Sequence, residues 1–196
     1  MTRRLPTAFF MVAMTLALAS AATAQRRPTI AIMPAQHAQP DAQSAENVTR
    51  GLVDRFEAEQ YRVIPMERAR ELFQRMGLDR RPNLSDAAIL RFGRRLGADL
   101  VARPQLLAVR HWEQRTTEVG EPAEARAVVY LRVLSVRTGQ PLYTRQVAYT
   151  FTSDSPYTET PVLPPSEARA AADEVSRSYF ERVAGSRQEL RSPSRR

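Results

Sequence analysis

The residues of this chain best suited to chemistry are its two histidines, His37 and His111. A zinc site needs three or four nitrogen, sulfur or carboxylate ligands, with short spacings between some of them. Neither histidine has such neighbours in sequence, and the chain contains no cysteine. We therefore expect no bound metal, and we interpret His111 as a solvated residue at the end of a strand.

Motifs of the common enzyme classes are also absent. The sequence has no G-x-S-x-G nucleophile turn, no Walker A phosphate loop, no G-x-G-x-x-G and no H-E-x-x-H. Glu57, Glu59, Glu67 and Glu71 stand among arginines at helical spacings, which favours solvated ion pairs. We expect no catalytic residue, no cofactor and no enzymatic activity. A carboxylate pair that forms only in the folded chain would leave no such trace in the sequence.

Residues 1–24 have the pattern of a secretory signal peptide. Arg3 and Arg4 form a basic start, an apolar run follows, and Ala22-Thr23-Ala24 is an A-x-A cleavage pattern, which predicts cleavage after Ala24. No second apolar run approaches the ~20 residues that span a bilayer. We expect an exported, soluble protein, periplasmic or extracellular, without a transmembrane segment in the mature chain. Because no cysteine is available for lipid attachment, we also expect that it is not a lipoprotein.

The charge pattern is unusual, because every basic residue is an arginine. The formal net charge is +8, and removing Arg3 and Arg4 with the signal peptide leaves 8 − 2 = +6. Coding bias explains the absence of lysine without any function. The alternative is a weak contact with an anionic surface such as lipid head groups or a wall polymer. We expect no nucleic-acid partner, because no basic motif interleaved with aromatic residues occurs.

Apolar periodicity predicts an α/β domain with a mixed five-stranded sheet and helices packed on it, in the order β-α-β-α-α-β-β-β-α. The clearest helix covers 86–96, with Ser85 as its N-cap and Gly97 at its end. In the strand over 127–136, we assign Ala127, Val129, Leu131 and Val133 to the core. Residues 25–184 form this single domain, and 185–196 are expected to be a disordered, arginine-rich tail. The expected strands are 29–34, 61–64, 100–112, 127–136 and 142–152, and the expected helices are 41–59, 65–76, 86–96 and 166–184.

Four segments, taken in order, carry a family resemblance. They are Ile30-Ala31-Ile32-Met33-Pro34, Tyr61-Arg62-Val63-Ile64-Pro65, Leu96-Gly97-Ala98-Asp99-Leu100-Val101, and 131–140, followed by an alanine-rich last helix. Over about 28–184 the chain resembles the amino-terminal domain of TolB, the curli-secretion protein CsgG, and the lipoprotein activators of penicillin-binding proteins. The resemblance implies a non-catalytic domain that binds other envelope proteins. The chain lacks the lipoprotein cysteine of CsgG and the activators, and the β-propeller of TolB.

The function expected from these observations is an exported, non-catalytic domain that binds a cell-envelope protein in assembly, transport or wall maintenance. Candidate contact residues are Trp112, Tyr157 in the proline-rich loop over 153–165, and Val162. The edge of the strand over 142–152 is a candidate for accepting an added strand. The alternative is an exported hydrolase or binding protein that acts on an anionic cell-wall polymer.

Overall fold

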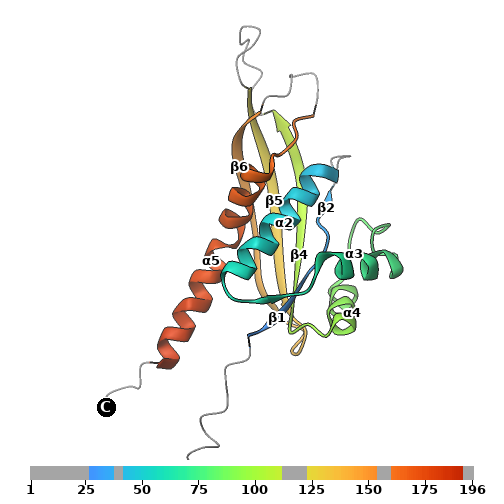
Figure 1. Cartoon of the computed structure of the whole chain (residues 1–196), viewed down its shortest axis with the longest axis vertical. Coiled ribbons are helices and arrows are strands. Elements are labelled where there is room, and N and C mark those ends of the chain that lie inside the picture. Colours follow the sequence, from blue (N-terminus) through green and yellow to red (C-terminus); the bar gives the residue numbers. More distant parts are fainter. Residues whose placement is uncertain (1–26, 38–41, 112–122, 154–159, 192–196) are drawn as a thin grey trace, which may run out of the picture.

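The computed structural model describes residues 27–37, 42–111, 123–153 and 160–191, with side chains of the last helix described as far as residue 184. This part of the chain contains six strands and four helices (Figure 1). The elements are β1 (Thr29–Ile32), β2 (Gln36–His37), α2 (Ala42–Ala58), β3 (Arg62–Val63), α3 (Met66–Arg75), α4 (Asp86–Leu96), β4 (Leu100–His111), β5 (Ala123–Ser135), β6 (Pro141–Ser153) and α5 (Pro165–Arg191).

All six strands belong to one mixed sheet, with the order β3-β1-β4-β5-β6 and with β2 also paired to β4. β1 pairs in parallel with β3 and β4, whereas β4, β5 and β6 form an antiparallel meander. The predicted fold class is confirmed. The added strand, β2, lies in what we expected to be a polar connection after the first strand.

Pro104 explains why β1 and β2 are separate strands. The Met33 amide donates to the Ala102 carbonyl at 2.9 Å, so the Pro104 nitrogen, two residues later, points to the same side of β4. Proline has no amide hydrogen to offer a neighbouring strand. β1 pairs with β4 as far as Ala102, and β2 resumes the pairing at Gln105. The change of partner therefore falls where β4 cannot donate.

The larger core lies between the sheet and the helices α2 and α5, which cross the same face side by side (Figure 1). The predicted core side of β5 is confirmed, since Ala127, Val129, Leu131 and Val133 are fully buried there. The two helices meet closely at Gly51. A Cβ atom there would lie 3.0 Å from the backbone of α5 at both Ala168 and Arg169.

A second core lies on the opposite face, where α3 and α4 pack against β1 and the adjoining ends of β4 and β5. The caps predicted for α4 are confirmed. Ser85 Oγ accepts from the Ala88 amide at 3.3 Å, and Gly97 ends the helix with φ of 69°. Gly93 lets α4 approach the sheet, because an added Cβ would lie 2.3 Å from Val101 Cγ2.

The last helix continues beyond its expected end. α5 runs past Gly185 to Arg191, so these residues of the predicted 185–196 tail are helical. Glycine lowers helix stability by about 1 kcal/mol but does not by itself end a helix. Residues 192–196 and the predicted signal peptide over 1–24, with its cleavage site at Ala24, lie outside the described residues. Among the helices that are described, none has the length and apolar character needed to cross a membrane.

Candidate partner-binding surface

β6 forms one edge of the sheet, because it pairs with β5 and with no other described strand. An edge strand presents backbone N–H and C=O groups that its single neighbour does not use. At the start of this edge, Arg182 of α5 covers the backbone, since its Nη1 approaches the Leu142 carbonyl at 3.5 Å. After Arg145, the segment Gln146–Ser153 contains no charged residue. The edge therefore lacks the charges that commonly prevent pairing with another chain.

Three side chains on one face of β6 fix the strand to α5. Tyr143 Oη donates to the Val175 carbonyl at 2.6 Å, and Arg145 Nη1 donates to Ser178 Oγ at 2.8 Å. Tyr149 Oη donates to Glu167 Oε2 at 2.8 Å. Burial, and then the hydrogen bond to the Glu167 carboxylate, raises the pKa of Tyr149. These bonds tie α5 to the edge strand between Tyr143 and Tyr149.

The opposite side of β4, β5 and β6 is largely uncovered, and we call it the outer face. Among the described elements, α3 and α4 reach only its end near β1. Alternate residues of β6, from Leu142 to Thr152, are exposed there, with Leu142 at 41%. The outer face and the open edge of β6 are therefore continuous.

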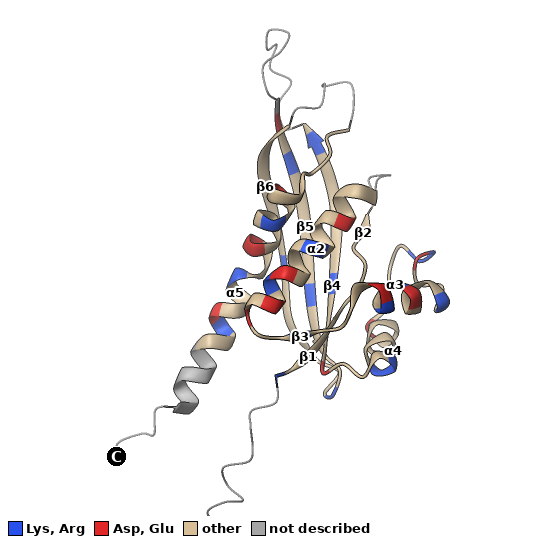
Figure 2. Cartoon of the chain, in the orientation of Figure 1, with Lys and Arg blue, Asp and Glu red and all other residues tan. Residues whose placement is uncertain are grey.

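Arginines of β4 and β5 face one another across the outer face. The strand register places Arg103 opposite Arg132 and Arg110 opposite Arg126. Like charges directly opposite in a sheet destabilise it unless they are compensated. Arg132 is compensated by Asp86 at 2.7 Å. Figure 2 shows these basic bands along β4 and β5, and acidic residues are scarce on the same strands.

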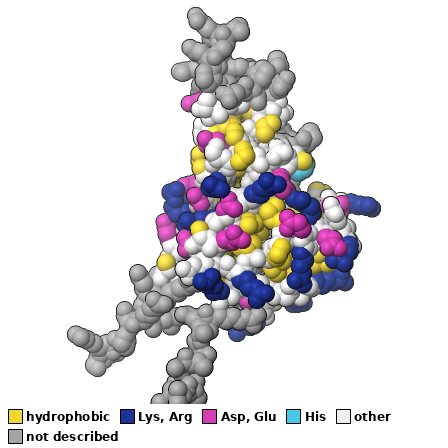
Figure 3. All heavy atoms as spheres, viewed as in Figure 1, with side chains coloured by type: hydrophobic (Ala, Val, Ile, Leu, Met, Phe, Trp, Pro, Cys, Tyr) yellow, Lys and Arg dark blue, Asp and Glu magenta, His cyan; other side chains and the backbone are white. Residues whose placement is uncertain are grey.

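The helical face is different, because its charges largely neutralise one another. Arg169 of α5 lies 2.6 Å from Asp54 of α2, and Arg55 of α2 lies 3.5 Å from Asp173 of α5. Figure 3 shows basic and acidic side chains interspersed over this face. Of the glutamates expected to form solvated ion pairs, Glu59 pairs with Arg55 at 2.9 Å and Glu71 pairs with Arg75 at 3.6 Å.

Arg103 is the most buried of these arginines, with 8% of its surface exposed. Its Nη2 donates to Gln36 Oε1 at 3.1 Å, and its Nη1 approaches the Leu84 carbonyl at 3.5 Å. Neither acceptor carries a formal charge. Desolvation lowers the pKa of Arg103, and Arg132 acts in the same direction, whereas Tyr130 and Asp86 oppose the shift without cancelling it. The burial of Arg103 could not be predicted from the sequence, because no residue near it in the chain indicates that the α3–α4 connection covers it.

A pocket of about 560 Å³ lies beside β2, and we call it the β2 pocket. Its walls come from the β1–β2 segment, the α3–α4 connection and the middle of β4. The lining residues are Ala35, Gln36, His37, Phe73, Asp79, Arg80, Arg81, Pro82, Asn83, Gln105, Leu106 and Leu107. His37 is therefore placed at a pocket. The sequence did not indicate that these three distant segments meet.

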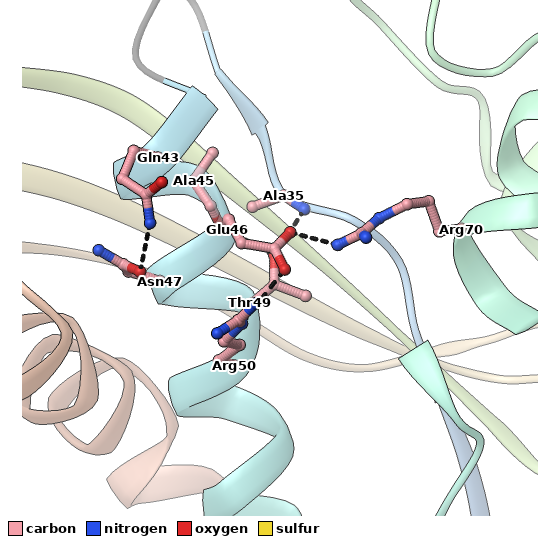
Figure 4. A network of polar contacts seen from close by, with 8 residues as sticks. All are labelled: Ala35, Gln43, Ala45, Glu46, Asn47, Thr49, Arg50 and Arg70. Carbon is pink, nitrogen blue, oxygen red and sulfur yellow. Dashed lines mark hydrogen bonds and ion pairs between the residues drawn. The ribbon is translucent and has the colours of Figure 1, made fainter. Parts of the chain in front are cut away.

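A network of polar contacts joins the segment before β2 to α2, and joins α2 to α3 (Figure 4). The Ala35 amide donates to Thr49 Oγ1 at 2.9 Å, and Thr49 Oγ1 donates to the Ala45 carbonyl at 2.9 Å. Glu46 pairs with both Arg70 of α3 and Arg50 of its own helix. These contacts fix the position at which the chain turns into β2.

The residues predicted to contact a partner are not brought together in the described structure. Val162 is 47% exposed and stands just before Leu163, which is fully buried against α2. Trp112 and Tyr157 lie outside the described residues. His111 is the last residue of β4 and lies in a different part of the sheet from His37. Among the described residues, no three His, Asp or Glu side chains gather as metal ligands would.

The chain matches no protein-family model, and no curated protein matches its sequence. Its structure is similar to lipoprotein GNA1162 from Neisseria meningitidis, with a TM-score of 0.52 and 14% identity over 81% of this chain and 99% of that one. The chain shares the fold of a bacterial lipoprotein. The hypothetical protein CT253 from Chlamydia trachomatis gives a TM-score of 0.50, 14% identity, and coverage of 81% and 96%. The LpoB C-terminal domain from Salmonella enterica gives a TM-score of 0.42 and 12% identity over 62% of this chain and 81% of that one. This likeness is too distant to support an argument.

These comparisons correct one expectation. We expected that the chain is not a lipoprotein, but a similar fold occurs in a protein named as a lipoprotein. The expectation rested on the absence of one anchoring residue, whereas the fold itself is one that lipoproteins adopt. The finer resemblance to TolB and CsgG remains a proposal.

Proposed function

We propose that this chain is a non-catalytic domain of the bacterial cell envelope, and that it binds an envelope protein by adding a strand of that partner to β6. The observation that carries this proposal is the open edge over Gln146–Ser153. Added strands bind through main-chain hydrogen bonds, and pockets or faces beside the edge supply specificity. The outer face offers such an adjoining surface.

The edge is suited to docking because its support is rigid. Val147, Tyr149 and Phe151 point toward α5 and pack against the larger core. Gln146, Ala148 and Thr150 point outward and are exposed. A docked strand would therefore pair with a preformed template, and little conformational entropy would be lost on the side of this protein.

The similarity to a bacterial lipoprotein supports a place in the envelope, as does the predicted signal peptide over 1–24. The alternative, a hydrolase or a binding protein for an anionic wall polymer, has less support. A hydrolase needs convergent acid and base groups. In the described part of the chain, many carboxylates instead pair with arginines, as Asp54, Asp86 and Glu174 do.

The test uses charged substitutions on the exposed side of the edge. Gln146→Lys together with Ala148→Lys places two charges on the exposed face of the edge strand, beside the position of an incoming strand, and lysine on an edge strand opposes pairing. A photo-crosslinking residue is placed at Thr144, and covalent adducts with envelope proteins are compared between this variant and the parent. We expect a reproducible adduct for the parent, and loss of that adduct in the lysine variant.

Gln74→Lys with Ala58→Lys is the matched control. It makes the same two chemical changes on exposed helical positions far from the edge. The control should keep the adduct, and thermal unfolding should show that both variants are folded. An adduct that survives equally in the edge variant would contradict strand addition at β6.

A further inference from the structure

We infer that the β2 pocket binds a small organic anion that carries an apolar group. The inference is independent of the β6 edge, because the pocket is formed by β2, β4 and the α3–α4 connection. Its volume of about 560 Å³ is within the usual range for sites that hold small molecules.

The polar groups around this pocket are largely uncommitted. Among the described residues, Arg80 and Arg81 form no ion pair, and the side-chain amides of Asn83 and Gln105 form no hydrogen bond. Two unpaired cations and two free amides at one pocket match the needs of a carboxylate or phosphate group.

The charge balance at the pocket favours an anion. Arg80 and Arg81 on the rim face only one acidic lining residue, Asp79. Arg103 adds a buried positive charge beneath Gln36, and its hydrogen bonds go only to neutral acceptors. A field of one sign in a partly desolvated hollow concentrates ions of the opposite sign.

The remaining lining is apolar and explains why the ligand needs an apolar group. Phe73, Pro82, Leu106 and Leu107 contribute to the wall and floor. An inorganic anion alone would leave this surface exposed to water. A ligand that places an apolar group there and an oxyanion at the arginine rim satisfies both parts of the pocket.

The pocket is also held in shape before any ligand binds. Gln36 Nε2 donates to the Arg81 carbonyl at 2.6 Å and approaches the Leu78 carbonyl at 3.4 Å. Gln36 Oε1 accepts from Arg103. The segment that bears both rim arginines is therefore tied to β2 and, through Arg103, to β4. Such preorganisation reduces the entropic cost of binding.

The ligand has an oxyanion next to an apolar group. Two sources share this chemistry, the carboxyl terminus of a peptide and a phosphate-bearing amphiphile. The probes are N-acetyl-Ala-Leu with a free carboxylate, its C-terminal amide, hexyl phosphate and hexanol, titrated by calorimetry and ¹⁵N NMR. We expect at least one anion to bind, with shifts in the amides of Gln36, Arg81 and Gln105. Each neutral counterpart should bind about tenfold or more weakly, because it lacks the charge-assisted hydrogen bonds. Tighter binding of N-acetyl-Ala-Leu would identify a peptide carboxylate as the ligand, and tighter binding of hexyl phosphate would identify a phosphate-bearing amphiphile.

Arg80→Gln with Arg81→Gln should weaken binding of the preferred anion by about tenfold or more. Arg91→Gln with Arg137→Gln is the matched control, because both residues are exposed and the net charge falls equally. The control should bind as the parent does. The inference is overturned if neither anion binds at millimolar concentration, if the preferred anion binds no more tightly than its neutral counterpart, or if the control loses as much affinity as the rim variant.

Discussion

Arg103 of β4 and Gln36 of β2 are joined by a hydrogen bond of 3.1 Å from Nη2 to Oε1. The same glutamine donates from Nε2 to the Arg81 carbonyl at 2.6 Å. One side chain thus links a buried cation to the connection between α3 and α4. This link couples the stability of the sheet edge at β2 to the shape of the pocket beside it.

The coupling between these two residues is measurable by a double-mutant cycle. Gln36→Ala leaves Arg103 Nη2 without its partner in a largely buried site, and should lower the free energy of unfolding by about 1–3 kcal/mol. Arg103→Met removes the buried charge, so the further loss caused by Gln36→Ala in that background should be smaller. Urea unfolding of the two single variants and the double variant gives the interaction energy. Additivity within ~0.5 kcal/mol would show that the bond contributes nothing.

Leu131 tests the assignment of the core face of β5. Its side chain is fully buried between the sheet and the helices α2 and α5. Leu131→Ala should reduce the free energy of unfolding by about 2–5 kcal/mol, because it removes buried apolar contacts and leaves a cavity. Leu142→Ala, at a leucine that is 41% exposed, should change it by less than about 1 kcal/mol. Equal unfolding midpoints for both variants would contradict the packing described.

Gly93 tests the approach of α4 to the sheet. In an exposed helix, replacing glycine by alanine stabilises by about 1 kcal/mol. Here the new Cβ would lie 2.3 Å from Val101 Cγ2 and 2.7 Å from Val136 Cγ2. Gly93→Ala should therefore destabilise the protein by about 1–3 kcal/mol through overpacking. A thermal midpoint above that of the parent would show that α4 lies farther from the sheet than it does here.

Tyr149 gives a pH dependence with a defined sign. Its pKa is raised above its usual value near 10 by burial and by the hydrogen bond to Glu167. A tyrosine with a raised folded-state pKa stabilises the fold below the unfolded-state pKa, and this stability is lost as pH rises through the folded-state value. Thermal midpoints recorded from pH 8 upward should fall less steeply above about pH 10 in Tyr149→Phe than in the parent. If the thermal midpoints of the parent and the variant fall in parallel with pH, Tyr149 does not contribute to the loss of stability at alkaline pH.

Features encoded within a few residues could be predicted from the sequence. The cap at Ser85 and the end at Gly97 define α4 through local hydrogen bonding and local backbone conformation. Alternation along β5 identified its buried face, because side chains on a strand change sides at each residue. The parallel pairing of β1 and β3 follows from the helix between them.

Features that depend on distant contacts could not be predicted. β2 is only two residues long, and its pairing is decided by the change of partner at Pro104. The burial of Arg103 depends on the connection that ends at Leu84, which is remote in sequence. The β2 pocket likewise joins segments that have no shared pattern. Contacts of Trp112 and Tyr157 with a partner remain predictions.

The segment before α5 is fastened to the start of α2 by two buried hydrogen bonds. The Leu163 amide donates to Ser44 Oγ at 2.7 Å, and Asn47 Nδ2 donates to the Leu163 carbonyl at 2.8 Å. Without α5, the apolar side of α2 is covered only by the sheet, and the larger core stays incomplete. The larger core is therefore completed only by α5, the last element of the described chain.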